Sequence, residues 1–416
     1  MSGPAGLPPT QEQDHPGATV FLKAGTRFAP EDMMTYAEKG KKPFSEVAHK
    51  IDLILSGPHA SAAFPREIAP FLADELGQRL QYDFSDITTD PLARLWAQSD
   101  PRVVYIANPV SRLIFDQNRP HPDDVAGMLR GFFDRLRRKT AGEDVGFSGV
   151  DTVRGVTFGN VPVLREPADD AAYEALVAVL NEAAGRTSLA YAAARDAVIE
   201  QVIEAKTRHL HEIDLSTVSH RDLQSATTLY VQSVHDTMNA TATPDGAVAT
   251  QRAKPDRLPW LVELGNRGNR QGDARVPATP GFLPASDPLT IPGAELRGIA
   301  GALCTAFGVE DAEFDAAISI NAPYIGAWEV QHMARLVRSM LPQASAMRAD
   351  GNHLKLRAGV YQSEYLRETL LGPSAVQALQ TPGTDWPMAD MDGLRAFAEK
   401  LAASQDILRC RVTSAL

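Results

Sequence analysis

Short apolar runs and amphipathic stretches alternate along the chain after about residue 45. The apolar runs have the length of strands, so each predicts a buried strand. These runs cover residues 51–55, 102–108, 228–235, 259–266, 315–323 and 353–365. Apolar residues at helical spacing predict helices over residues 65–80, 122–140, 169–208 and 391–404. Strands that alternate with helices are typical of an α/β fold. We therefore expect one large three-layer α/β domain, with helices on both faces of a mixed, mostly parallel twisted sheet.

Composition divides the chain further. The chain begins with MSGPAGLPPTQEQDHPG, and this content of Pro, Gly, Gln and Asp is typical of a disordered segment. We therefore expect residues 1–45 to form a flexible tail and residues 46–416 to form the single domain. Residues 169–210 are expected to be helices inserted into that domain. Residues 243–288 are rich in Gly, Pro, Asp and Arg and predict long loops, which are often functional in compact domains.

Charge and cysteine content exclude several classes of protein. The net charge of -11 argues against a nucleic-acid partner, because duplex-binding proteins carry basic surfaces. No run of 18 apolar residues predicts a membrane span, and the N-terminus lacks the basic start and apolar core of a secretory signal. The two cysteines, Cys304 and Cys410, do not form a CxxC pair, which favours a reducing compartment. We expect a cytoplasmic protein.

Polar side chains follow most of the predicted strands. They are His59, Asn108, His235, Asn266, Asn321 and Glu364. In open α/β sheets, ligands bind at the carboxyl ends of the strands. We therefore expect these side chains to share one pocket, although strand ends become polar in most α/β proteins because loops are solvated.

Five segments resemble the N-formylglutamate amidohydrolases, a family of zinc hydrolases whose fold is related to the zinc carboxypeptidases. In chain order they are SGPHASAAFP, DITTDPLARLW, SRLIFDQNRP, VHDTMN, and NAPYIGAWEVQHMAR followed by VYQSEYLRETLLG. The third is similar to the family's Ser-Arg-Tyr-x-x-Asp-x-Asn-Arg motif and is the most specific match. Together the segments span residues 51 to about 372. The chain departs from the family where His-Ser-Met becomes His235-Asp236-Thr237-Met238, and where Gly-Gly becomes Gly326-Ala327.

The resemblance implies one zinc ion held by His59, Asp90 and His235. Asp86 and Glu67 are alternative acidic ligands, and Asp90 could instead cap the helix that follows it. Two neutral imidazoles and one carboxylate leave zinc a fourth position for water, whose pKa falls to about 7 when it is bound. A second candidate histidine cluster, in HLHEIDLSTVSH, follows a charged helical run instead of an apolar strand.

The resemblance also assigns the remaining site residues. Glu364 matches the late glutamate that resembles the general base of the zinc carboxypeptidases. Substrate binding is assigned to Arg112, Asn118, Arg119, Asn321 and Tyr324. A guanidinium can hold a carboxylate through two parallel hydrogen bonds. Alternatively, Arg112 and Asp116, four residues apart, pair with each other structurally.

We therefore expect a zinc-dependent amidohydrolase that cleaves the amide bond of a small N-formyl or N-acyl amino acid bearing a carboxylate. Two alternatives stay open. One is a carboxypeptidase-like hydrolase acting on a peptide or conjugate. The other is a non-catalytic relative with a binding role.

Overall fold

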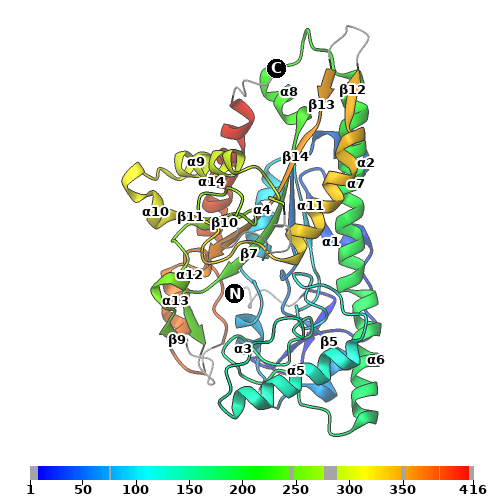
Figure 1. Cartoon of the computed structure of the whole chain (residues 1–416), viewed down its shortest axis with the longest axis vertical. Helices are drawn as coiled ribbons and strands as arrows, with labels where there is room; N and C mark the ends of the chain where they lie inside the picture. The colour runs from blue at the N-terminus through cyan, green and yellow to red at the C-terminus, as the bar shows by residue number, and fades with distance from the viewer. Residues whose placement is uncertain are drawn as a thin grey trace, which may run out of the picture.

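The centre of the fold is a seven-stranded mixed sheet with helices on both faces (Figure 1). The computed structural model describes residues 8–74, 76–242, 248–275, 288–347, 353–383 and 385–411. Across the sheet the strands are β11 (Ile318–Ile320), β10 (Val262–Gly265), β14 (Arg357–Leu366), β7 (Thr228–Thr237), β4 (Leu53–Gly57), β6 (Val103–Ala107) and β3 (Met34–Tyr36). The predicted α/β class is confirmed.

Four neighbouring strands of the sheet, β14, β7, β4 and β6, run parallel to one another. The strands β10 and β11 are parallel to each other, but β10 is antiparallel to β14. The strand β3 is antiparallel to β6 at the other edge. The carboxyl ends of the four parallel strands therefore lie along one edge of the sheet, and β10 and β11 end towards the opposite edge.

Alternating side chains of the central strands pack into two separate cores. The side chain of Ile54 points to one face of the sheet, where it packs in a core with apolar residues of α7 (Ser188–Glu212) and α11 (Trp328–Met340). The side chains of its neighbours Leu53 and Leu55 point to the other face, which is covered by α4 (Thr89–Ser99), α9 (Gly293–Phe307) and α14 (Met391–Cys410). A strand buried on both faces is expected to be continuously apolar, as β6 is and as the first three residues of β4 are. The three predicted layers are therefore present.

A third core lies below the sheet in Figure 1, where α5 (Val125–Thr140) and α6 (Asp170–Arg186) pack. A small sheet borders it, made of β1 (Gln11–Gln13), β2 (Val20–Leu22) and β5 (Phe64–Pro65). The predicted helix over residues 65–80 is wrong. The chain forms a 3₁₀ helix (Arg66–Phe71) and the short α3 (Gln78–Asp83) instead. Pro70 has no amide hydrogen to continue an α-helix, and Gly77 starts the second segment.

The prediction of a flexible tail over residues 1–45 is wrong for residues 8–45. Residues Val20–Leu22 are buried in the small sheet, and β3 forms the edge of the large sheet by pairing with β6. Met33 and Met34 are buried beside α7. The Pro- and Gly-rich start concealed these two short apolar segments. Residues 1–7 lie outside the described part of the chain.

The remaining elements surround the sheet. They are α1 (Pro30–Met33), α2 (Phe44–Val47), α8 (His220–Thr227), β8 (Ala240–Ala242), β9 (Val248–Gln251), α10 (Phe314–Ala317), β12 (Ser345–Met347), β13 (His353–Lys355), α12 (Arg367–Leu371) and α13 (Pro373–Leu379). Short 3₁₀ helices cover Ala48–Lys50, Lys254–Asp256, Asp311–Glu313 and Leu341–Gln343.

The predictions for residues 169–210 and 243–288 can be compared with the structure in part. The helices expected over residues 169–210 are α6 and α7. The loops expected over residues 243–288 contain β9 and β10, and residues 243–247 and 276–287 lie outside the described residues. Among the helices that the structure describes, none has the length and apolar character needed to cross a membrane.

Candidate metal centre and active site

A cavity of about 330 Å³ opens at the carboxyl ends of the central strands. His59 follows β4, whereas His235 and Glu364 face each other across the paired strands β7 and β14. A second wall comes from the segment after β6, which carries Arg112, Asn118 and Arg119. The parallel order of the strands therefore brings together residues that are far apart in the sequence, as an α/β sheet is expected to do.

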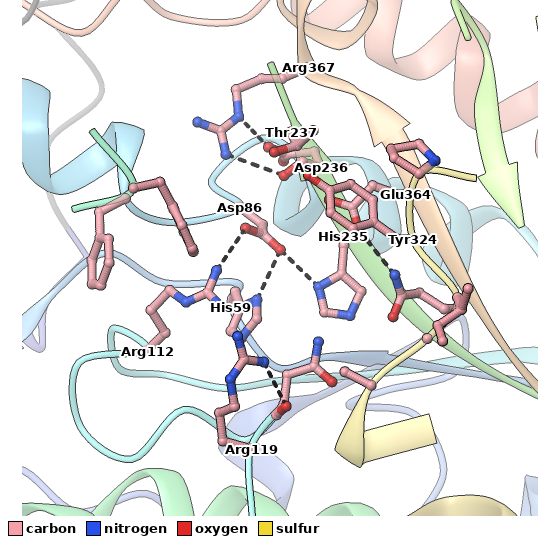
Figure 2. Close-up of a pocket in the computed structure, with 18 of the residues that line it drawn as sticks. His59, Asp86, Arg112, Arg119, His235, Asp236, Thr237, Tyr324, Glu364 and Arg367 are labelled. Atoms are coloured by element: carbon pink, nitrogen blue, oxygen red, sulfur yellow. Dashed lines mark hydrogen bonds and ion pairs between the residues drawn. The ribbon is translucent and has the colours of Figure 1, made fainter. Parts of the chain in front are cut away.

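Two imidazoles converge on one carboxylate in this cavity. Nδ1 of His59 lies 3.1 Å from Oδ2 of Asp86, and Nδ1 of His235 lies 2.9 Å from the same oxygen (Figure 2). One ligand atom from each of the three residues lies within 4.8 Å of the other two, and all three side chains are buried. Ligand atoms around a zinc ion, at bond lengths of about 2.0–2.2 Å, lie at comparable separations.

The hydrogen-bond partner of His59 on the side of the ring away from Asp86 determines which ring nitrogen carries a proton. Nε2 of His59 lies 2.7 Å from Oδ1 of Asp116. Burial raises the pKa of Asp116, but Arg112 and His59 lower it well below its ordinary value, so the carboxylate is ionised and can only accept. Nε2 of His59 therefore donates. In the neutral ring this leaves the Nδ1 lone pair directed at Asp86.

The hydrogen-bond partner of His235 on the side of the ring away from Asp86 acts in the same way. Nε2 of His235 lies 2.8 Å from Oγ of Ser233, and that hydroxyl donates to Oε2 of Glu329 at 2.5 Å. Glu329 is fully buried and forms an ion pair with Arg195 at 2.8 Å. Burial raises the pKa of Glu329, but Arg195 and Ser233 lower it below its ordinary value, so it accepts. Ser233 must then accept from Nε2 of His235, which leaves the Nδ1 lone pair facing Asp86.

Three acceptors thus point at one buried position, and such an arrangement requires a positive charge between them. Burial raises the pKa of Asp86, but the two imidazoles lower it far below its ordinary value. Burial and Arg112 lower the pKa of His59, but Asp116 and Asp86 raise it further, so that the net change is a rise. A proton on an imidazole can supply this charge, and so can a metal ion. Two histidine nitrogens and a carboxylate oxygen are a ligand set that zinc accepts.

The structure does not bring Asp90 to the histidines, and the prediction of this ligand is corrected. Its carboxylate accepts from Nε of Arg94 at 2.8 Å and from the hydroxyl of Tyr105 at 3.1 Å. Asp86, the alternative acid, occupies the position instead, and its backbone amide donates to the carbonyl of His59 at 3.1 Å. The other alternative, Glu67, pairs with Arg186.

Asp236 explains why the turn before α4 presents Asp86. Its Oδ2 accepts from the backbone amides of Thr88 and Thr89, at 3.0 and 2.9 Å, and from the Thr88 hydroxyl. Its Oδ1 accepts from Arg367. Asp236 therefore caps the N-terminus of α4, the role considered for Asp90, from a strand far away in the sequence. Its position directly after His235 was the only sequence signal for this role.

Glu364 lies in the cavity wall opposite His235 in the register of β14 and β7. It is 8% exposed, and its Oε2 accepts from Nε2 of Gln362 at 3.2 Å. Burial raises the pKa of Glu364 to about 7; His235 opposes this rise, whereas Asp86 and Asp236 add to it. A carboxyl group with such a pKa can exchange a proton near neutral pH.

The predicted substrate-binding residues after β6 line the cavity, and two of them form ion pairs. Arg112 donates to Oδ2 of Asp116 through Nε and Nη2, at 3.1 and 2.7 Å, so the structural pairing of these two residues is present. Its Nη1 also lies 3.9 Å from Oδ1 of Asp86. Arg119 donates to Asp151 at 2.9 Å. Oδ1 of Asn118 accepts the backbone amide of Glu329 at 3.4 Å.

The expectation that all polar strand ends share one pocket is wrong for Asn108, Asn266 and Asn321. Nδ2 of Asn321 donates to Oδ1 of Asn266 at 2.8 Å, and neither residue lines the cavity. The reason is that β10 and β11 are antiparallel to β14, so they end away from the edge of the sheet where the cavity opens. Asn108 supports the loop before His59 by donating to the carbonyl of Pro58. Tyr324 does line the cavity.

The comparison with protein families agrees with the motifs in the first part of the chain. Residues 51–183 match the model of a family described as N-formylglutamate amidohydrolase. Two solved structures are similar: an N-formylglutamate amidohydrolase from Ralstonia eutropha JMP134 and a gene product of Agrobacterium tumefaciens. Their sequence identities are 15% and 14%, and their TM-scores are 0.45 and 0.42. The matches cover 86% and 87% of this chain, and 93% and 92% of the other chains.

No curated protein matches the chain. The matched segment contains His59, Asp86, Arg112 and Arg119, whereas His235 and Glu364 lie outside it. The predicted resemblance is thus confirmed: in residues 51–183 the chain carries the sequence pattern of the N-formylglutamate amidohydrolase family.

Proposed function

We propose that the protein is a metal-dependent amidohydrolase that cleaves the amide bond of an N-formyl or N-acyl amino acid bearing a carboxylate. The observation that carries the proposal is the convergence of two imidazole lone pairs and one carboxylate oxygen on a single buried position. The family match over residues 51–183 supports the same class of reaction.

His59, Asp86 and His235 would hold one zinc ion. When bound, zinc lowers the pKa of a water molecule to about 7 and polarises the amide carbonyl. Glu364, in the cavity wall, would accept a proton from the attacking water and deliver it to the nitrogen of the leaving amine. A carbon–oxygen bond forms and the carbon–nitrogen bond breaks, so that one water and one amide yield a carboxylic acid and an amine.

The two arginines after β6 have separate parts in this proposal. Arg112 lies beside Asp86, where its guanidinium stabilises negative charge that develops on the carbonyl oxygen. Arg119 donates to Asp151 through Nε and to the carbonyl of Asn118 through Nη1. Its Nη2, for which the structure gives no hydrogen bond to any residue that it describes, can donate to the α-carboxylate of the substrate. Tyr324 and Asn118 complete the walls of the cavity.

A cavity of about 330 Å³ favours a small substrate over an extended peptide. A panel that compares N-formyl-L-glutamate with N-acyl dipeptides separates these two classes, and we expect turnover of the small substrate. The low cysteine content favours a cytoplasmic setting for the reaction.

The test combines metal analysis with an assay of deformylation. We expect about one zinc per chain in the wild type and loss of this zinc in His59→Ala and in Asp86→Asn. Asp90→Asn is the matched control, because Asp90 lies four residues after Asp86 but bonds to Arg94, and this variant should keep its zinc. Glu364→Gln should keep zinc as well and lose activity by roughly 10²- to 10⁴-fold. A folded wild type that binds no metal would reject the proposal.

A further inference from the structure

Among the residues that the structure describes, the side chain of Gln362 has one hydrogen-bond partner, Glu364. Gln362 is 3% exposed and lines the cavity. Its Nε2 donates to Oε2 of Glu364 at 3.2 Å, whereas its own Oε1 is buried without a partner in the described part of the chain. A buried amide with an unpaired oxygen is costly to the fold. The contact with Glu364 is therefore the feature of this glutamine that needs an explanation.

The strand β14 fixes the side on which these two side chains meet. Gln362 and Glu364 lie two positions apart on this strand, so they point to the same face of the sheet. The neighbours of Gln362 on the adjacent strands are Gly265 on β10 and Ser233 on β7. Gly265 has no side chain, and the hydroxyl of Ser233 donates to Glu329. Neither neighbour donates to the amide of Gln362, which leaves this group to Glu364.

The two oxygens of Glu364 are unequal as a result. Oε2 accepts from Gln362. Oε1 has no hydrogen-bond partner among the described residues, but the protein does not enclose it, so it is the oxygen that is open to the cavity. A proton on Oε2 would meet the NH₂ group of Gln362, which is a donor and has no lone pair to offer. A proton that Glu364 takes up therefore belongs on Oε1.

We propose that Gln362 is a positioning residue for proton transfer, because it confines the transferable proton to Oε1 of Glu364. This inference rests on the proposed function, in which Glu364 passes a proton from the attacking water to the leaving nitrogen. The oxygen of the water bonds to the carbonyl carbon, the carbon–nitrogen bond breaks, and the proton ends on the amine. Without Gln362 the carboxyl group can rotate and the proton can occupy either oxygen, so it reaches the nitrogen less often.

The first measurement compares two leaving groups on the same formyl substrate. One substrate is N-formyl-L-glutamate, and the other is its thioester analogue, in which sulfur replaces the amide N–H. An amine leaves only after its nitrogen is protonated, whereas a thiolate leaves without a proton. We expect Gln362→Met to lower kcat for the amide by about 10- to 100-fold and kcat for the thioester by less than about threefold. KM for both should stay nearly unchanged.

Gln232→Met is the matched control. Gln232 is a buried glutamine on the neighbouring strand β7, but it bonds to Tyr361, Ser363 and Tyr365 and does not line the cavity. This variant should keep the wild-type ratio of the two rates. Gln362→Leu, which also lacks the donor, is measured in parallel, and circular dichroism shows whether each variant folds.

Infrared spectroscopy of the protein without substrate tests the same contact without turnover. The carbonyl band of the protonated Glu364 carboxyl group is identified by its loss in Glu364→Gln. A carbonyl oxygen that accepts a hydrogen bond absorbs at lower wavenumber, so the band should move upwards in Gln362→Met and stay in place in Gln232→Met.

The role of Gln362 is overturned if this band does not move, or if the amide and thioester rates fall by the same factor in Gln362→Met. Failure of the proposed function has a different result. In that case the zinc-loaded wild type hydrolyses neither the amide nor any other N-acyl amino acid, although the infrared band still moves.

Discussion

At the scale of single residues, the hydroxyl of Ser233 determines which ring nitrogen of His235 directs its lone pair at Asp86. It accepts from Nε2 of His235 and donates to Glu329, which leaves the lone pair of Nδ1 directed at Asp86. Groups of this kind orient ligating histidines and raise their basicity. Ser233 and His235 lie two positions apart on β7, so they share one face of the strand.

Replacing Ser233 by alanine should therefore weaken zinc binding by about 10- to 100-fold. The measurement is a competition titration of the zinc dissociation constant. Ser56→Ala is the matched control, because Ser56 also contacts Glu329, at 3.1 Å, but the structure gives it no hydrogen bond to His235 among the residues that it describes. Equal effects of the two substitutions would show that the network supports only the fold.

The histidines could be predicted at this scale, but the acid could not. His59 follows an apolar run and His235 ends one. Because parallel strands of a sheet end at the same edge, residues at these ends are expected to lie together. Asp86 lies in a turn between two helices, α3 and α4, and its direction depends on Asp236 holding the N-terminus of α4. That contact joins residues almost 150 positions apart, and no local pattern contains it.

At the scale of elements, the N-terminus of α4 depends on one buried carboxylate. Asp236 accepts from two backbone amides of this helix and pairs with Arg367, which is also buried. The loss of this charge leaves the guanidinium of Arg367 unpaired in the interior, which is costly.

We expect Asp236→Ala to lower the free energy of unfolding by about 3–5 kcal/mol and to weaken zinc binding, because the turn that carries Asp86 loses its anchor. Urea denaturation followed by circular dichroism measures the first effect. Asp392→Ala, which removes an exposed carboxylate from the first turn of α14, provides the comparison and should change stability little. An unchanged urea midpoint in Asp236→Ala would refute the anchoring role.

Strands and long helices were predictable because their apolar periodicity is continuous. The failures share a physical cause. Strand β3 has three residues, too few to show a period, and its stability comes from pairing with β6. Residues 65–80 have helical spacing, but Pro70 removes a backbone donor. The directions of β10 and β11, which exclude Asn266 and Asn321 from the cavity, depend on chain crossings that a strand pattern does not contain.

At the scale of the whole molecule, the burial of Lys206 predicts that stability depends on pH. Nζ of Lys206, on α7, is fully buried and donates to the carbonyl of Ser225 at 2.7 Å. Burial lowers the pKa of Lys206 to about 8, with Asp52 opposing the change and Arg409 adding to it. The ordinary pKa of lysine is about 10.4, so between about pH 8 and pH 10 the unfolded chain binds more protons than the folded one.

The contribution of Lys206 to the free energy of unfolding should therefore rise with pH across this range, by about 3 kcal/mol in total, and stay at its lower value below pH 8. Urea denaturation at pH 7.5, 8.5 and 9.5 compares the wild type with Lys206→Met, in which this dependence should be absent. Lys23→Met, which changes an exposed lysine, should behave as the wild type. Parallel pH profiles for wild type and Lys206→Met would contradict the assignment.

The most direct test of the metal centre is a crystal structure of the zinc-loaded protein with anomalous data at the zinc absorption edge. We expect one strong peak about 2.0–2.2 Å from Nδ1 of His59, Nδ1 of His235 and an oxygen of Asp86, with Nε2 of each ring still bonded to Asp116 or Ser233. A peak bound by Asp90 or by the Nε2 nitrogens, or a cavity without any peak, would contradict it.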